Sequence, residues 1–131
     1  MNAKTKKIIG WGLTGLLALV FIGSASMKIM GGDEAVKGAE AMGISLTVLR
    51  MIGVVEILSL VLFIIPRSGV LGTLLLAAYL GGAMVAHLLQ GQPIIMPMIV
   101  QCVLWITAAV RFPELTRRIA TGGGAVQPLQ G

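Results

Sequence analysis

Four long apolar segments constrain the fold of this chain more than any other feature. They cover residues 8–27, 44–65, 69–89 and 94–112, and each is close to the roughly 20 residues that a helix needs to cross a bilayer. None alternates between apolar and polar residues as a half-buried strand does, and a segment in lipid must satisfy its own backbone hydrogen bonds. The sequence therefore predicts an all-α integral membrane protein, a bundle of four transmembrane helices.

Prolines mark the ends of two of these segments. Pro66 ends the second segment and Pro113 ends the fourth. Proline has no backbone N–H to donate, so it does not continue a helix. Pro93 starts the fourth segment, and Pro97 lies in its first turn, where a missing N–H costs little. The pattern supports helices in these segments.

The remaining residues divide the chain further. Residues 66–68 and 90–93 are tight connectors, so we expect the second helix to lie beside the third and the third beside the fourth. Residues 31–43 mix both charges and predict a short surface helix or an ordered loop. We expect residues 1–7 to form a basic N-terminal segment and residues 113–131 to form a flexible tail on the same side.

Charge is sparse, and its distribution indicates orientation. Apolar residues make up 56% of the 131 residues and charged residues 11%, as is typical of a membrane protein. Most of the basic residues flank apolar segments, whereas a nucleic-acid-binding protein gathers them on a polar face, so we expect a lipid bilayer as partner and no nucleic acid. Two lysines, Lys28 and Lys37, fall on one side. The other side carries Lys4, Lys6, Lys7, Arg67, Arg111, Arg117 and Arg118, which predicts that both termini lie in the cytoplasm.

Two features leave alternatives open. The Lys-rich start, the apolar run and GSAS at residues 23–26 also resemble a secretory signal peptide, whose cleavage would leave three spans. Residues 16–28 and 74–87 are both apolar, turn to small residues and end on a basic residue. This similarity fits a duplicated helical hairpin, as in many transporters, or chance.

Polar side chains inside the apolar segments are the candidates for function. A charge at the centre of a membrane helix costs about 2.5–3.5 kcal/mol on insertion scales, so Glu56 needs a partner or a role. At about 1.5 Å per residue, the polar side chains lie in the outer half and the centre of the membrane. We expect them to line one pocket that opens outward, with Glu56 and His87 as candidate catalytic residues and Tyr79, Gln101, Trp105, Arg50 and Lys28 as candidate ligand-binding residues.

Simpler interpretations exist for these residues. Glu56 could be a neutral buried carboxyl that bonds Tyr79 or Gln101 and only holds helices together. Lys28 and Arg50 could extend to the outer interface, with Lys28 the better candidate for this. Arg50 and Glu56 are six residues apart and lie on different faces of one helix, so we expect the partner of Glu56 on another helix. His87, the single histidine, could simply be a polar residue at the end of its helix, without a role as a ligand or proton carrier.

Sulfur-containing residues give little evidence for a metal. Cys102 is the only cysteine, which excludes an intrachain disulfide. Apart from Met1, the methionines all fall in the predicted outer half; thioethers with a histidine can bind Cu(I), but methionine is also common in membrane cores. No zinc, nucleotide or dinucleotide motif occurs, so no metal site is predicted.

Three stretches carry a resemblance to a known family: GSASMK at 23–28, RMIGVVEILSLVLFIIP at 50–66 and GTLLLAAYLGGAMVAHLL at 72–89. Over residues 8–112 the chain resembles the DoxX-like family of small four-helix bacterial membrane proteins. The resemblance rests on Lys28, Arg50, Gly53, Glu56, Pro66, Gly72 and His87. It implies a four-helix bundle in the inner membrane. The family takes its name from a subunit associated with a thiosulfate:quinone oxidoreductase, and other relatives are linked to redox-stress complexes or to membrane-protein assembly.

Two functional hypotheses follow. The first is a redox-associated subunit that binds a quinone-like molecule around Glu56, with His87 exchanging protons with the outer side and a partner membrane protein supplying electron transfer. The second is a non-enzymatic scaffold or assembly factor for another membrane protein. A small-molecule transporter would need a homo-oligomer to form a pathway.

Overall fold

The computed structural model describes residues 2–121, and within them every regular element is helical. The last ten residues of the predicted flexible tail, 122–131, lie outside this range. The elements are α1 (Ala3–Met30), α2 (Asp33–Met42), α3 (Leu46–Ile64), the 3-10 turn η1 (Pro66–Ser68), α4 (Gly69–Leu89), α5 (Ile95–Arg111) and α6 (Pro113–Thr121). The predicted all-α class is confirmed.

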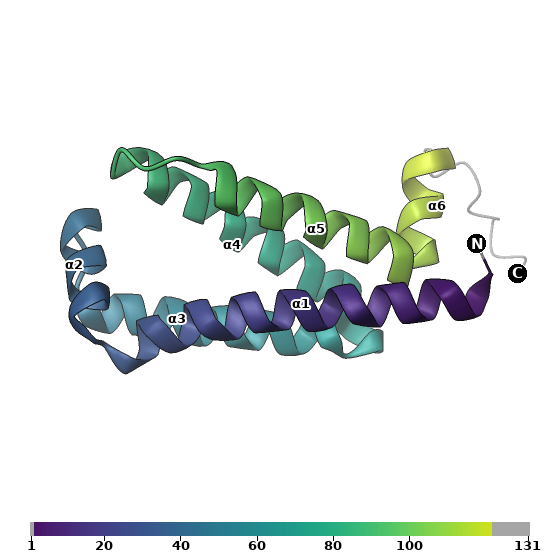
Figure 1. The fold of residues 1–131 in the computed structure, drawn as a ribbon, viewed down its shortest axis with the longest axis horizontal. Helices are drawn as coiled ribbons and strands as arrows, with labels where there is room; N and C mark the ends of the chain where they lie inside the picture. The colour runs from purple at the N-terminus through teal and green to yellow at the C-terminus, as the bar shows by residue number, and fades with distance from the viewer. Residues whose placement is uncertain (1, 122–131) are drawn as a thin grey trace, which may run out of the picture.

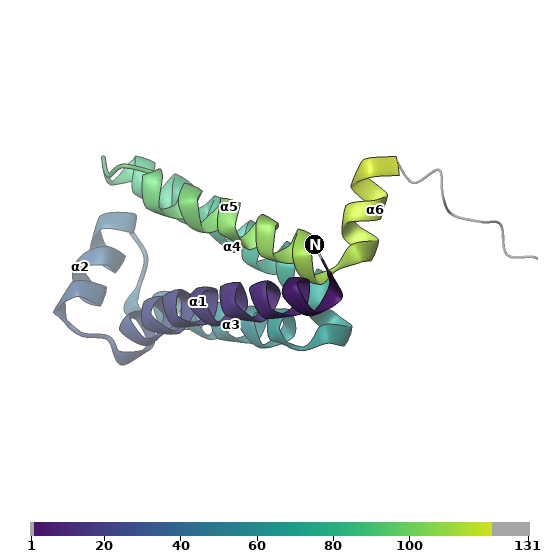
Figure 2. The same cartoon turned by 45° about the vertical axis from the view of Figure 1, so that its right-hand side comes forward.

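Four long helices form the bundle. α1 packs against α3 and α5, and α4 packs against the same two helices, so the four close into a ring. Figures 1 and 2 show two pairs, α1 with α3 and α4 with α5, that converge toward one end of the bundle. The pairs lie close together at the end where α1 begins, which we call the terminal end. They diverge toward the opposite end, which carries α2 and which we call the α2 end.

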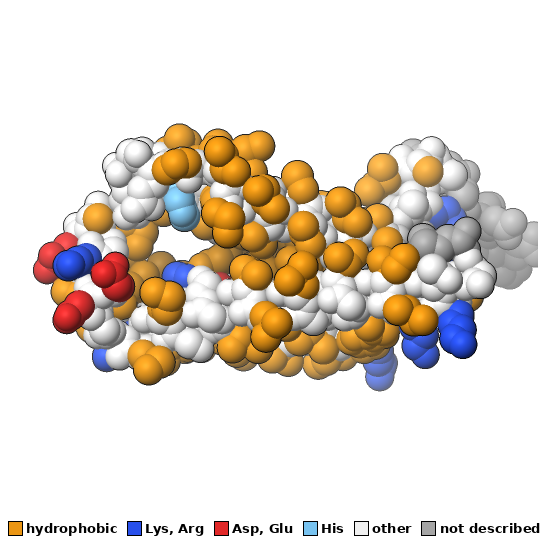
Figure 3. All heavy atoms as spheres, in the orientation of Figure 1, with side chains coloured by type: hydrophobic (Ala, Val, Ile, Leu, Met, Phe, Trp, Pro, Cys, Tyr) orange, Lys and Arg blue, Asp and Glu red, His pale blue; other side chains and the backbone are white. Residues whose placement is uncertain are grey.

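The bundle suits a lipid environment. α1, α3, and α4 together with η1 are each long and apolar enough to cross a membrane. α5 has 17 residues, about 26 Å of helix, and forms a bent pair with α6 that can count as a fourth span. Apolar side chains cover much of the outer surface in Figure 3, as expected where lipid replaces water.

Helix boundaries differ from the predicted ones near both ends of the described chain, and one alternative for the charged segment between the first two spans is now settled. α1 begins at Ala3, so residues 3–7 of the basic N-terminal segment belong to the first helix. Residues 31–43, for which helix and loop were both open, contain α2, which ends at Gly43 in a left-handed conformation (φ 71°). Residues 113–121, expected to be flexible, form α6. Pro113 starts this helix in the position where proline is favoured, and α6 turns by 100° from α5.

Arg111 connects three helices at the terminal end. Its Nη1 donates to the carbonyl oxygen of Phe63 at 2.9 Å, and its Nη2 donates to the carbonyl oxygen of Ile64 at 3.0 Å. These carbonyls belong to the last turn of α3, where a helix leaves acceptors unsatisfied. Nη1 also reaches Thr14 Oγ1 on α1 at 3.3 Å. The guanidinium lies over three aromatic rings, those of Trp11, Phe63 and Phe112.

Gly72 allows α4 to lie directly on α3 near this contact. A Cβ added at Gly72 would lie 2.2 Å from the backbone nitrogen of Phe63, and backbone atoms cannot rotate away as a side chain can. Gly81 is on the same helix, but a Cβ added there would have nothing within 4 Å. The two glycines therefore offer a matched pair of substitutions.

We expect Gly72→Ala to lower the free energy of unfolding by about 1–3 kcal/mol, because the methyl group forces α3 and α4 apart. Gly81→Ala should leave stability unchanged or slightly raised, because alanine favours helix over glycine by up to about 1 kcal/mol. Thermal unfolding of both variants in the same detergent measures the difference. Equal melting temperatures for the two would contradict the close packing at Gly72.

Candidate functional site

A cavity of about 510 Å³ lies between the two helix pairs in the half of the bundle nearer α2. Figure 3, which looks across the long axis, shows the surface hollowed between the pairs. The cavity lies where the pairs diverge, and its wall is mostly apolar. Residues from α1, α3, α4 and α5 line it, together with Met42 of α2. Its size falls within the roughly 300–1,000 Å³ typical of small-molecule sites.

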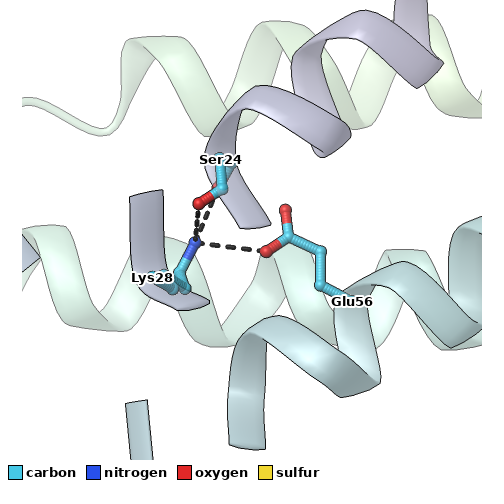
Figure 4. Close-up of polar contacts among 3 residues, drawn as sticks. All are labelled: Ser24, Lys28 and Glu56. Atoms are coloured by element: carbon cyan, nitrogen blue, oxygen red, sulfur yellow. Dashed lines mark hydrogen bonds and ion pairs between the residues drawn. The ribbon is translucent and has the colours of Figure 1, made fainter. Parts of the chain in front are cut away.

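A buried ion pair forms part of the cavity wall. Lys28 Nζ on α1 lies 3.2 Å from Glu56 Oε2 on α3, and Glu56 is 0% exposed while Lys28 is 21% exposed. Ser24, one turn before Lys28, accepts a hydrogen bond from Nζ through Oγ at 2.6 Å. Figure 4 shows the three side chains meeting between the two helices. The sequence expectation that the partner of Glu56 comes from another helix is confirmed.

Small residues bring these two helices together. A Cβ added at Gly53, one turn before Glu56, would lie 3.2 Å from the carbonyl oxygen of Ala25 and 3.2 Å from Lys28 Cβ. The backbone of α1 therefore approaches α3 beside the ion pair, as small residues allow between membrane helices. The hydrogen bonds from Lys28 to Ser24 and Glu56 fix the lysine side chain across this contact.

Two further predicted residues lie at the cavity. The Tyr79 ring is 5.4 Å from Lys28 Nζ, close enough for a cation–π contact, and it packs edge-on against Phe21 with centroids 6.2 Å apart. His87 lies two turns further along α4, is partly buried, and contacts the carbonyl oxygen of Ala83 through Nδ1 at 2.7 Å. Both residues line the cavity.

Three predicted residues lie elsewhere. Gln101 and Trp105 are partly buried on α5 but are not among the residues that line the cavity. Gln101 Oε1 is buried and has no hydrogen-bond partner among the described residues. Arg50 is exposed; its guanidinium lies against Gly31 at the end of α1, so close that a Cβ there would be 2.6 Å from Nη2.

Two interpretations from the sequence need correction. The simpler interpretation of Lys28, that it extends to the outer interface, is wrong. Its ammonium group donates hydrogen bonds to Ser24 and Glu56 inside the bundle. Glu56 bonds neither Tyr79 nor Gln101 among the described contacts; its partner is Lys28. The depth estimate alone missed this pairing, since depth says nothing about which faces of two helices meet.

Sequence reasoning did not select several cavity residues, of which Ser24 matters most. The only available signal was the spacing of four residues between Ser24 and Lys28, which places both on one helix face. Within residues 2–121, no three His, Cys, Asp or Glu side chains form a group that could hold a metal ion. Met42 and Met96 do line the cavity with His87.

The profile of the DoxX-like family matches residues 12–110. The chain belongs to the DoxX-like family. The matched region of this DoxX-like protein includes Lys28, Glu56 and His87, and so contains the ion pair and the cavity. No curated protein and no solved structure matches the chain.

We expect Lys28→Met to lower the free energy of unfolding by about 3 kcal/mol, because it leaves the Glu56 carboxylate buried without its cation. The value lies at the low end for buried pairs because Lys28 is 21% exposed. Replacing both residues, as Lys28→Met with Glu56→Leu, should recover most of the loss. Unfolding of the two single variants, the double variant and the exposed-site control Lys37→Met measures the coupling. A Lys28→Met protein as stable as the wild type would contradict the ion pair.

Proposed function

We propose that this DoxX-like protein is a redox-associated membrane subunit that binds a quinone-like molecule in the cavity around Glu56. One observation carries the proposal: a largely apolar cavity of about 510 Å³ has a buried ammonium–carboxylate pair in its wall. Such a site suits a molecule with an apolar body and a small polar head. Quinones have this character, and they reside in the same bilayer as the protein.

The position of the cavity supports access from lipid. The hollow in Figure 3 lies between the helix pairs on a side of the bundle, and not at a tip. In a membrane that side faces lipid, so an apolar molecule could reach the cavity without crossing water. A head group would then meet Lys28 and Glu56, while the apolar tail lies along residues such as Phe21, Leu49 and Val100.

Each polar residue has a proposed role. Glu56 accepts a hydrogen bond or a proton from the head group, and Lys28 keeps the carboxylate in place. His87 lines the same cavity nearer the α2 end, where it would exchange protons with the aqueous side. Electron transfer would be supplied by a partner membrane protein, because the chain has one histidine, one cysteine and no flavin motif.

A non-enzymatic scaffold is the second candidate, and the surface of α2 favours it. Asp33, Glu34, Lys37 and Glu40 are exposed on this short helix, and Figure 3 shows charged side chains of both signs gathered at the α2 end. Such a patch beside a membrane could contact a partner protein. This role requires neither the cavity nor Glu56 to bind anything.

Mass spectrometry of organic extracts from the protein purified in mild detergent distinguishes these functions. We expect the wild type to retain a quinone, counted as the total of its oxidised and reduced forms, in near-stoichiometric amount. Glu56→Gln should lose most of it, because the amide removes the carboxylate that accepts the hydrogen bond or proton of the head group. Glu34→Gln is the matched control, since it makes the same chemical change at an exposed position on α2. Equal retention by all three proteins would exclude a role for Glu56 in binding, and absence of quinone from all three would favour the scaffold.

We propose that this inner-membrane protein has both termini in the cytoplasm and its cavity in the outer half of the membrane. The Lys and Arg distribution supports this orientation, since seven basic residues lie at the terminal side. Membrane-impermeant thiol labelling of single cysteines tests it in a Cys102→Ser background. We expect labelling of intact cells at Gly38→Cys on α2 and protection at Thr121→Cys on α6. The reverse pattern would invert the orientation.

A further inference from the structure

The ammonium group in the cavity wall is hydrogen-bonded within the protein. Lys28 has three N–H groups, and three acceptors surround its Nζ: Ser24 Oγ at 2.6 Å, Glu56 Oε2 at 3.2 Å and the Ser24 carbonyl oxygen at 3.5 Å. The ammonium group therefore has its hydrogen-bonding capacity engaged within the protein. The strongest donor at the cavity is not free for a ligand.

The second oxygen of Glu56 is an unused acceptor. Oε1 is buried and has no hydrogen-bond partner among the described residues, while Oε2 bonds Lys28. Burying a carboxylate oxygen without a hydrogen-bond donor costs free energy, and the cost is larger than for a neutral acceptor. A ligand that brings a donor to Oε1 would remove this cost.

His87 presents a second acceptor because its backbone contact selects one tautomer. Nδ1 lies 2.7 Å from the carbonyl oxygen of Ala83, and a carbonyl oxygen only accepts, so Nδ1 carries the proton. In the neutral ring, Nε2 then has a lone pair and accepts. The same histidine lines the cavity, so two polar groups of the wall, on different helices, offer acceptors.

From this pattern we infer that the cavity binds the reduced, hydroxyl-bearing form of its ligand in preference to the oxidised form. The inference rests on the proposed function and specifies the redox state. A hydroquinone carries two O–H groups that can donate to Glu56 Oε1 and to His87 Nε2. The matching quinone carries carbonyl oxygens that only accept, so it leaves Oε1 without a donor and brings like partial charges together.

Anaerobic equilibrium dialysis of the detergent-purified protein tests this preference with a decyl-substituted benzoquinone and its hydroquinone. We expect the wild type to bind the hydroquinone about tenfold or more tightly, the ratio typical of one hydrogen bond to a charged acceptor. In Glu56→Gln the side-chain amide offers a donor as well as an acceptor, so the ratio should fall to about threefold or less. Glu34→Gln should keep the wild-type ratio.

His87→Phe provides a second measurement that does not disturb the ion pair. It keeps a planar ring but removes Nε2, so the hydroquinone should bind several-fold more weakly while the quinone is unaffected. Equal binding of the two forms by the wild type, or tighter quinone binding, would overturn the inference and leave the proposed quinone site standing. Failure of both forms to bind would overturn the proposed function and the inference with it.

Discussion

The contact between Lys28 and Glu56 decides how α1 and α3 are arranged in the half of the bundle that holds the cavity. No water is available in a hydrocarbon core to solvate either charge, so each must find its counterpart in the protein. Glu56 is fully buried, and Lys28 reaches it across a helix contact that Gly53 makes close. The rotation of α1 about its axis is thereby fixed relative to α3. Ser24, Tyr79 and His87 then fall around one cavity.

Arg111 also joins helices, at the terminal end of the bundle, but it does so without an ion pair among its described contacts. It pairs with no carboxylate among its described contacts; it donates to backbone carbonyls at the end of α3 and stacks on aromatic rings. Arginine suits this role because its planar group offers several donors and packs on ring faces. The lysine contact joins α1 to α3 within one helix pair. The arginine contact joins α5 to α1 and α3, and so links the two pairs.

The sequence predicted the helices well because hydrophobic length and proline are local signals. The end of α3 before Pro66 and the extent of α4 agree with the predicted segments. Gln101 and Trp105 were expected in the pocket but lie outside it, because the rotation of α5 depends on packing with α1 and α4. α6 was missed because its nine residues have polar composition and begin with a proline. The partner of Glu56 depends on which helix faces meet, which no local pattern specifies.

The Arg111 contact has a mechanical consequence for the cavity. The pair α1–α3 is held together by its ion pair, and the two pairs are joined at the terminal end by Arg111 and by the edge-on packing of Phe63 and Phe112, with centroids 6.3 Å apart. Two stiff arms joined near one end behave as a lever whose displacement grows with distance from the pivot. A rotation too small to break the contacts at Arg111 therefore changes the width of the gap most near α2. Any relative rotation of the two pairs therefore has its largest effect beside the cavity, toward the α2 end.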